Sequence, residues 1–401
     1  MPKVLFVNCS CYGSTGKIIS DIADCAVNRG FECVLCSPLG DGTNQNIKNI
    51  RTSLPYEQGI YRRINGFFGY QYGFAPLSTQ KIKATIKKEK PDIVHLHCTN
   101  GSMVNIYSLA AFLKKKKIPT VITNHAEFFY TGSCSHAQDC ERWKSGCGKC
   151  PRRLESTGSR LFDPSANAFA KMKKAFYGMN AVMVSVSPWV AERAAQSPIT
   201  AGLAQKTVLN GVNTDIFYPR DVAELQKKHG LDESTRVIFH VTSNFSDSEN
   251  DIKGGRYLLE LARRTENTVF FIAGNREINF ELPKNVIPLG RIADQSLLAG
   301  YYSMADLTVL TSKRETFGMA VAESLCCGTP VAAFYSGGSE SIAIDEFCRF
   351  AEFGSVDGLH EAVRTLLSQE LNKEELAMRA KEKYDSRIMA NQYIDIYNDL
   401  I

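Results

Sequence analysis

The sequence lacks three features that would place the protein in a membrane, outside the cell or on a nucleic acid. No apolar run reaches the ~18 residues of a membrane-spanning helix. The N-terminal apolar run at 4–7 is shorter than the roughly 7–15 residues of a signal-peptide core. Lysine and arginine (47) exceed aspartate and glutamate (42) by only five, too few to require a nucleic-acid partner. We therefore expect a cytoplasmic protein that binds no nucleic acid.

The cysteines do not form a disulfide framework, because their number, 13, is odd and no secretory signal precedes them. Most lie in apolar stretches and are expected to be small core residues. Four lie within 131–151 with the spacing C-x5-C-x6-C-x2-C: Cys134, Cys140, Cys147 and Cys150. Four thiolates with one close pair are typical of structural zinc, with His136 as another possible ligand. An iron–sulfur cluster, disulfides or free thiols are the alternatives.

Short apolar runs alternate with helical patterns in both halves of the chain. They lie at 4–8, 32–37, 93–97, 120–125, 181–187, 237–243, 269–274, 286–290, 307–312 and 330–335. Buried strands separated by helices are typical of parallel sheets in α/β proteins. We predict two Rossmann-like, doubly wound domains facing across a cleft, at 1–218 (with the Cys-rich insert 131–151) and 219–380. A helix at 381–401 is expected to pack back on the first domain.

The first strand is followed by a glycine-containing loop, CSCYGSTGKI. Cys11 and Ile18 occupy the places of the first glycine and the Ser/Thr of a P-loop, which argues against that motif. Gly13 and Gly16 could still let backbone N–H groups hold a phosphate or a sugar. The alternative is that they only allow a tight turn.

The segment 311–340 carries the strongest signal for function. Glu315 and Glu323 are separated by seven residues, and Gly318 between them can open a helix whose free N–H groups face an anion. Two carboxylates in this arrangement could bind a sugar and a ribose. A surface acid and a solvated helix acid would show the same spacing.

This stretch resembles the Glu-x7-Glu signature of the retaining glycosyltransferases of family 4, which have the GT-B fold. The resemblance extends over nearly the whole chain, through PDIVHLH, NGVNTDIFYP, LGRI, YYSMADLTVLTSKRETFG and ESLCCGTPV. The first half with its Cys-rich insert is similar to enzymes that build bacterial exopolysaccharide and O-antigen repeat units. The resemblance implies a hexosyltransferase that uses a UDP or GDP sugar and a glycan acceptor, which we expect to be lipid-linked.

The family resemblance also implies roles for individual residues. Glu315 would contact hydroxyls of the donor sugar, and Glu323 would bind both ribose hydroxyls. The backbone of Thr316, Phe317 and Gly318 would hold the diphosphate, and Lys253 would neutralise its growing charge. Gly290 and Arg291 lie where the family holds the nucleotide base, Gly13 and Gly16 line the donor site, and His125 matches an active-site histidine.

The sequence departs from the family pattern in two places. The family usually has an arginine about five residues before the lysine, where this chain has Ser248; Arg256 could substitute for it. The segment TNHAEFF replaces a His-Asp pair, so that Glu127 could take the role of the aspartate.

No nucleophile is evident, which fits the family picture of front-face attack by the acceptor hydroxyl. The sequence contains no Asp-x-Asp, so we expect no metal or other cofactor in catalysis. The alternatives are a nucleotide-sugar epimerase of the same architecture and a non-enzymatic protein that binds a nucleotide sugar or a partner. His97 is interpreted as a structural histidine, and strand alternation is taken to place His95 on the opposite face.

Aromatic residues lie beside basic ones near 61–74. Arg62 and Arg63 precede Phe67, Phe68 and Tyr70, while lysines crowd 81–90 and 114–117. Such a mixture suits an anionic bilayer or a lipid-diphosphate acceptor, and suggests peripheral contact with the inner face of the cell membrane. A solvated lysine face with ordinary core aromatics is the alternative.

Overall fold

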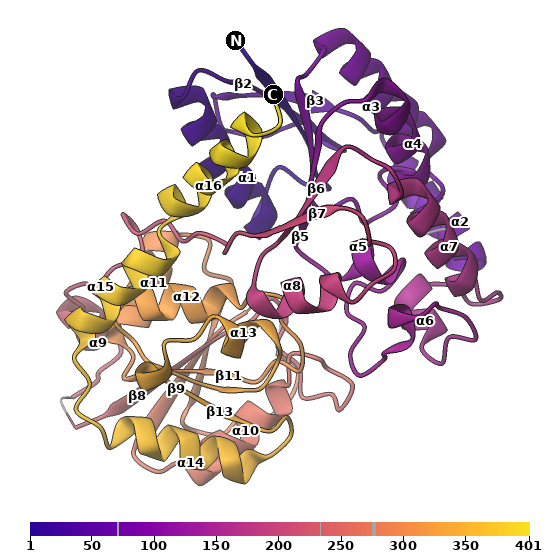
Figure 1. Ribbon diagram of the computed structural model, residues 1–401. Helices are drawn as coiled ribbons and strands as arrows, with labels where there is room; N and C mark the ends of the chain where they lie inside the picture. The colour runs from indigo at the N-terminus through magenta and orange to yellow at the C-terminus, as the bar shows by residue number, and fades with distance from the viewer. Residues whose placement is uncertain (70–71, 233, 275–277) are drawn as a thin grey trace. The chain divides into compact units, whose positions relative to one another are not determined.

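The structure is a computed structural model that describes residues 1–69, 72–232, 234–274 and 278–401. It contains two compact units (Figure 1). Unit 1 consists of Met1–Leu209 and Met389–Ile401, and unit 2 consists of Asn210–Ile388. Within the described ranges, no helix combines the length and the apolar character needed to cross a bilayer.

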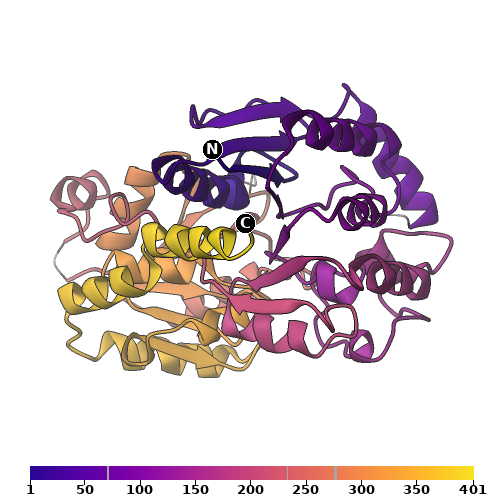
Figure 2. The ribbon, with the colours of Figure 1, turned by 45° about the horizontal axis from the view of Figure 1, so that its top comes forward.

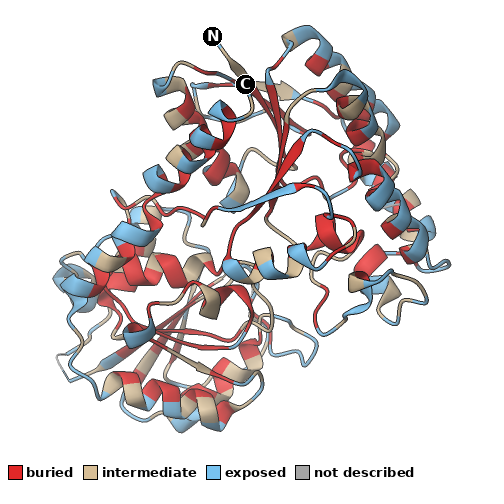
Figure 3. Cartoon of the chain, in the orientation of Figure 1, coloured by how far each residue is buried: buried red, intermediate tan, exposed pale blue. Residues whose placement is uncertain are grey.

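Unit 1 contains a seven-stranded sheet in the order β3-β2-β1-β4-β5-β6-β7, in which every pairing is parallel. Its strands are β1 (Lys3–Val7), β2 (Glu32–Ser37), β3 (Ile47–Arg51), β4 (Ile93–Leu96), β5 (Thr120–Asn124), β6 (Ala181–Ser185) and β7 (Ala204–Thr207). The central strands are buried, as expected for a parallel sheet covered on both faces, whereas β7 is exposed throughout (Figure 3).

The helices of unit 1 are α1 (Gly13–Asn28), α2 (Glu57–Phe68), α3 (Pro76–Glu89), α4 (Ile106–Lys116), α5 (Phe128–Thr131), α6 (Arg153–Thr157), α7 (Ser165–Phe176) and α8 (Pro188–Ala195), with a 3-10 turn at Arg142–Lys144. Local signals begin several of them. Asn105 accepts a hydrogen bond from Ser108 N at the start of α4, and Ser187 accepts one from Val190 N at the start of α8, where Pro188 is the first helical residue.

The last helix, α16 (Ser386–Asn398), completes the core of unit 1. Met389, Tyr393, Ile394 and Tyr397 are buried in one apolar cluster with residues of α1 and β1. Figures 1 and 2 show α16 lying beside α1, and Asn391 Oδ1 accepts a hydrogen bond from the Arg29 guanidinium there at 3.0 Å. The final residues of the chain therefore belong to the same core as its first strand.

Unit 2 contains a six-stranded sheet in the order β10-β9-β8-β11-β12-β13, again parallel. Its strands are β8 (Arg236–Val241), β9 (Thr268–Ala273), β10 (Val286–Gly290), β11 (Leu307–Leu310), β12 (Val331–Phe334) and β13 (Cys348–Ala351). Its helices are α9 (Ala223–Lys228), α10 (Gly255–Arg264), α11 (Gln295–Met304), α12 (Met319–Cys326), α13 (Gly338–Ser341), α14 (Val356–Leu367) and α15 (Lys373–Tyr384), with a 3-10 turn at Asp345–Phe347. The predicted α/β class with two doubly wound sheets is confirmed.

The boundary between the units differs from the expected position near 218. The segment 210–219 belongs to unit 2 because it pairs with the junction of α15 and α16. Val212 N donates to Tyr384 O at 2.7 Å, Ser386 N donates to Val212 O at 2.9 Å, and Thr214 donates to the Asp385 carboxylate. The residues 381–384 end α15, so the helix that joins unit 1 begins later than predicted, at Ser386.

Candidate active site

Lys253 and Glu315 meet beyond the carboxyl ends of the strands of unit 2. Lys253 Nζ lies 2.6 Å from Glu315 Oε1, and each side chain is 26% exposed. Lys253 precedes α10, and Glu315 lies in the loop between β11 and α12. Because the pair stays open to solvent, its ammonium can meet an anionic ligand while its carboxylate accepts hydrogen bonds from hydroxyls.

The backbone around Lys253 is held in place by short-range hydrogen bonds. Lys253 N donates to Asp251 Oδ1 at 3.1 Å, and Thr311 Oγ1 donates to Lys253 O at 2.8 Å. Gly254 has a φ of +68°, and a Cβ there would lie 2.3 Å from Thr311 O. Glycine is therefore required where the lysine loop passes against the end of β11.

The loop that carries Glu315 is fixed against the segment after β12. Glu315 N donates to Ser336 O at 3.0 Å, and Gly338 N donates to Glu315 O at 2.8 Å. Phe317 is 2% exposed and packs edge-on against Tyr384, so its side chain anchors the loop and leaves its backbone for a ligand. Gly318 then starts α12 with a φ of +91°. Thr316 lies between Glu315 and Phe317, shortly before the free N–H groups of that helix.

Glu323 lies inside α12 and is oriented by a tyrosine that the sequence reading did not single out. Tyr302, at the end of α11, donates from its hydroxyl to Glu323 Oε2 at 3.1 Å. Burial, with Glu323 nearby, raises the pKa of Tyr302 well above its usual value, so the phenol keeps its proton. The tyrosine hydroxyl therefore orients the Glu323 carboxylate.

Gly290 ends β10 with a φ of +66°, and its carbonyl accepts a hydrogen bond from Gly274 N at 3.0 Å. Arg291 follows it and is exposed. Arg256, considered as a replacement for the missing arginine, is bound elsewhere: its guanidinium donates to Tyr257 at 2.7 Å and pairs with Glu249 at 3.1 Å. Ser248 takes part in the local turn, where its carbonyl accepts from Asp251 N. Lys253 is therefore the basic group that pairs with Glu315.

The corresponding edge of unit 1 is organised by Asn8, which follows β1. Its side chain accepts from Cys98 N at 3.0 Å and donates to Ser10 O and to Thr15. Gly16 is buried, and a Cβ there would lie 2.4 Å from Cys11 O, so α1 can begin close under the loop only with glycine. Gly13 starts α1 with a φ of +74° and is exposed.

His125, directly after β5, contacts a second histidine. His97 Nδ1 lies 2.9 Å from His125 Nε2, and the two rings are stacked with their centroids 5.1 Å apart. Burial lowers the pKa of His125 to about 4 and places that of His97 well below its usual value. Both rings are therefore neutral near pH 7 and act through hydrogen bonds rather than charge.

The expectation for His95 was wrong. Its ring lies beside that of His97, with centroids 3.8 Å apart, because residues i and i+2 of a strand share a face. His95 Nδ1 lies 2.6 Å from the Tyr397 hydroxyl and Nε2 lies 2.8 Å from Thr123 Oγ1. His95 thus links β4 to α16 in the core.

Glu127 anchors the Cys-rich insert. Its buried carboxylate accepts from Ala137 N at 2.9 Å and from Arg193 at 3.3 Å. The Arg193 guanidinium also lies 4.8 Å from the ring centroid of Trp143 in the insert and of Trp189 on α8. Sequence reading did not identify Arg193, and these contacts give Glu127 a structural role.

The four insert cysteines are free thiols in this structure. Cys147 Sγ contacts Thr131 O at 3.6 Å, and Cys150 Sγ contacts Ser156 Oγ at 3.2 Å. Across residues 1–69, 72–232, 234–274 and 278–401, no group of three or more histidine, cysteine or acidic side chains is placed to hold a metal ion. The structure thus lends no support to the predicted zinc ligand set of Cys134, Cys140, Cys147 and Cys150.

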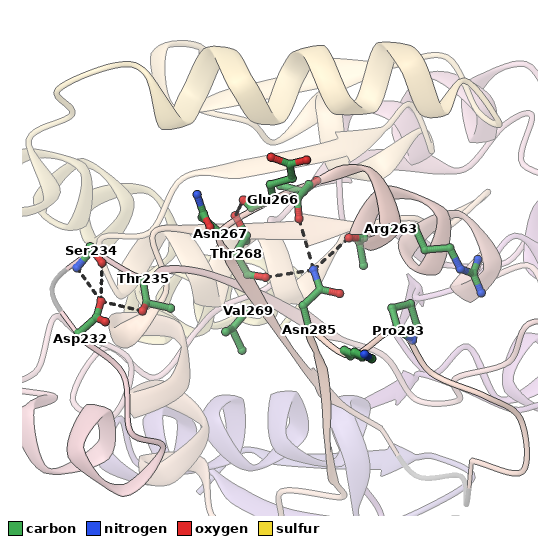
Figure 4. Close-up of a pocket in the computed structure, with 13 residues that line it drawn as sticks. Asp232, Ser234, Thr235, Arg263, Glu266, Asn267, Thr268, Val269, Pro283 and Asn285 are labelled. Atoms are coloured by element: carbon green, nitrogen blue, oxygen red, sulfur yellow. Dashed lines mark hydrogen bonds between the residues drawn. The ribbon is translucent and has the colours of Figure 1, made fainter.

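A pocket of about 1120 Å³ opens at the opposite edge of the unit 2 sheet (Figure 4). It lies at the amino ends of β8, β9 and β10, and its polar groups bind one another: Asn285 Nδ2 donates to three backbone carbonyls, and Asp232 accepts from Ser234 and Thr235. Ligands of open parallel sheets bind at the carboxyl ends, so we place the candidate site at Lys253, Glu315 and Glu323.

Two family models together match most of the chain. The model described as Glycosyltransferase Family 4 matches residues 15–216, and the one described as Glycosyl transferases group 1 matches residues 221–384. The chain is 25% identical over 210 residues to N-acetyl-alpha-D-glucosaminyl L-malate synthase of Bacillus anthracis, covering 49% of this chain and 54% of that enzyme. It is 23% identical over 332 residues to the putative colanic acid biosynthesis glycosyl transferase WcaC of Escherichia coli, covering 77% of each.

Solved structures share the architecture. Sucrose-phosphate synthase from Thermosynechococcus elongatus aligns over 100% of this chain and 99% of its own, with a TM-score of 0.74 and 15% identity. The Anabaena protein HepE in complex with UDP and glucose aligns over 100% of both chains, with a TM-score of 0.67 and 15% identity. At such identities these alignments establish the fold.

Proposed function

Since the chain belongs to glycosyltransferase family 4, we propose that it is a retaining hexosyltransferase. In this proposal a hexose passes from a UDP or GDP sugar to a lipid-linked glycan acceptor of a bacterial surface polysaccharide, at the inner face of the cell membrane. The Lys253–Glu315 pair, 2.6 Å apart, carries the proposal. The similarity to a putative colanic acid transferase and to a structure that holds UDP supports the choice of pathway class and donor class.

Each site residue would bind a different part of the donor. Glu323, oriented by Tyr302, would accept hydrogen bonds from both ribose hydroxyls. Lys253 would neutralise the diphosphate beside the backbone N–H groups that start α12, where a helix favours negative charge. Glu315 would bind the sugar hydroxyls, and the backbone at Gly290 and Arg291 would hold the base. The family resemblance also assigns Gly13 and Gly16, in the first loop of unit 1, to donor binding.

The reaction proceeds by front-face attack in this proposal. The acceptor oxygen bonds to the anomeric carbon on the face that the nucleotide leaves, while the bond from that carbon to the phosphate oxygen breaks. The acceptor proton passes to an oxygen of the departing diphosphate, and Lys253 stabilises the charge that remains. His125, neutral near pH 7, positions a hydroxyl by hydrogen bonding and neither gives up nor takes up a proton in this step. Because the sequence has no Asp-x-Asp, we propose that the donor binds without a metal.

A thermal-shift panel of UDP, GDP, ADP and their sugars, with and without EDTA, tests this function. A ligand that binds only the folded state raises the melting midpoint. We expect one diphosphate series to do so after chelation, and the stabilising sugar nucleotide to yield an α-configured product with an acceptor glycan. Epimerised sugar nucleotide without transfer would establish the epimerase instead, and stabilisation by none of them would refute the donor site.

We also propose that the Cys-rich insert takes up one structural zinc ion in the cell, as its cysteine spacing predicts. Metal analysis of the purified protein should then find about one zinc per chain through four thiolates. The double variant Cys147→Ser/Cys150→Ser should lose the zinc and give less folded protein, whereas Cys25→Ser, outside the insert, should change neither. Wild-type protein that folds without zinc would refute the proposal.

A further inference from the structure

Unit 1 exposes apolar side chains on two segments that are far apart in the sequence. Ile60 and Phe67 on α2 are 56% and 55% exposed, and Leu161 and Phe162, between α6 and α7, are 61% and 57% exposed. Large apolar side chains grouped on a surface mark an interaction site. We call the surface formed by Ile60, Arg62, Arg63, Phe67, Leu161 and Phe162 the α2 surface.

The two segments form one continuous surface. The rings of Phe68 and Phe162 stack with their centroids 6.1 Å apart and their planes inclined by 4°. Arg160 N donates to Gly66 O at 3.1 Å, and Ser159 Oγ donates to Phe67 O at 3.1 Å. These contacts join the end of α2 to the segment between α6 and α7 (Figure 1), so the exposed side chains lie on neighbouring segments.

Arginines without an acidic partner lie around these apolar side chains. Arg62, Arg63 and Arg160 are exposed, and within the described part of the chain none of the three forms an ion pair. The acid of α2, Glu57, is buried, where it accepts from Leu54 N and Ser78 N. Asp163 accepts from Cys150 N and Ser165 N. Glu155 on α6 pairs with Arg152, so these acids have partners of their own. Three guanidinium groups stay available for an anion.

We infer that the α2 surface docks on an anionic lipid bilayer. Aromatic and aliphatic side chains that alternate with arginines fit the boundary of a bilayer, where the apolar parts enter the acyl region and the guanidinium groups pair with phosphates. The absence of acids from the exposed side of α2 is the charge complementarity that selects this occupant. The inference deepens the proposed function and rests on it, because a lipid-linked acceptor lies in a membrane.

The structure also moves the predicted membrane contact away from the lysine clusters. Lys83 donates to Ser108 and lies over the Phe112 ring together with Lys87, while Lys114 donates to the carbonyls of Lys174 and Tyr177. Several of these lysines therefore bind their own unit. Tyr70, part of the aromatic run, lies outside the described residues.

Sedimentation of the full-length protein with lipid vesicles tests the inference. We expect binding to phosphatidylcholine vesicles that contain phosphatidylglycerol, little binding to phosphatidylcholine alone, and a loss of binding at high salt. The charge variant Arg62→Glu/Arg63→Glu and the apolar variant Ile60→Ser/Phe67→Ser should each reduce the bound fraction about tenfold or more. The matched control Lys115→Glu/Lys116→Glu makes the same change of charge on exposed lysines of α4 and should bind almost as the wild type does.

Parallel measurements separate the possible outcomes. Each variant should keep the wild-type melting midpoint and its stabilisation by the nucleotide, which shows that only docking has changed. Wild-type protein that ignores anionic vesicles, or equal losses in the α2 and α4 variants, would overturn the inference. If the wild type is a dimer and the α2 variants are monomers, a second copy of the chain covers this surface and the inference is overturned. If the protein binds vesicles but no nucleotide stabilises it, the docking inference holds and the proposed function is refuted.

Discussion

The carboxyl edges of the two sheets carry side chains of opposite character. In unit 2 the edge holds charged, partly exposed groups, with Lys253 and Glu315 paired at its centre. In unit 1 it holds Asn8, His97 and His125, of which the two histidines are neutral. This difference fits the proposed function, in which the charged edge binds a diphosphate and the neutral edge binds the hydroxyls of a sugar acceptor.

The largest expected difference between the two units is in how far acid lowers their free energies of unfolding. Burial lowers the pKa of His95, His97 and His125 in unit 1 and of His229 and His240 in unit 2. Between about pH 6.5 and pH 4 the unfolded chain binds protons that the folded one does not, so the free energy of unfolding falls with pH. The loss is up to about 1.4 kcal/mol per pH unit for each histidine, hence larger in unit 1, which holds three of these five histidines.

Tryptophan fluorescence can follow unit 1 by itself, because the two tryptophans, Trp143 and Trp189, both lie there. We expect circular dichroism to follow the unfolding of unit 2 as a separate transition at higher urea. Between pH 7.5 and pH 5, the urea midpoint of the fluorescence transition should fall further than the midpoint of that transition. The variant His125→Asn should reduce this acid sensitivity. Equal shifts for both signals would contradict the contrast between the units.

Removal of the unit 2 charge should have the next largest effect. We expect Lys253→Ala to lower kcat/KM for the sugar nucleotide about 100- to 1000-fold, because the leaving diphosphate loses its cation. Steady-state kinetics with the donor found in the thermal-shift panel measure this. The exposed Lys284, at the amino edge of the same sheet, supplies the control: Lys284→Ala should keep wild-type rates. An unchanged rate in Lys253→Ala would remove the lysine from the mechanism.

The smallest effect should come from the orientation of the ribose-binding carboxylate. Glu323→Gln should weaken nucleoside diphosphate binding about tenfold, since charged hydrogen bonds to the ribose are lost. Tyr302→Phe removes only the hydroxyl that orients Glu323 and should weaken binding about threefold. Calorimetric titration measures both. Equal affinities for the wild type and Glu323→Gln would exclude the ribose role.

Sequence patterns predicted the buried strands well and the polar edges of the sheets poorly. The apolar runs at 93–97 and 307–312 contain β4 and β11. The missed strands β3 (IKNIR), β7 (AQKT) and β13 (CRFA) each lie at the edge of a sheet, and β7 is exposed throughout, because an edge strand needs little burial. Hydrophobic periodicity cannot reveal a strand whose stability comes from its backbone pairing.

The candidate site could be predicted where residues lie close together in the sequence. Glu315, Gly318 and Glu323 form one local motif. Tyr302 and Asn8 act through contacts with distant segments, and the spacing of residues in the sequence does not predict such contacts. Glu127 shows the same limit: a carboxylate after a strand suggested a site residue, but its partners Ala137 and Arg193 give it a structural role.

The position of α16 has a consequence for how the protein is made. The core of unit 1 needs Tyr393 and Tyr397, whose hydroxyls complete the hydrogen bonds of Thr123 and His95. The ribosome must first synthesise residues 210–388, which takes about 10–35 s at roughly 5–20 residues per second. During that time the apolar face of unit 1 that α16 covers stays exposed. Unit 2 can fold at once, because it is one continuous segment. The unit that is translated first is therefore the last to be completed.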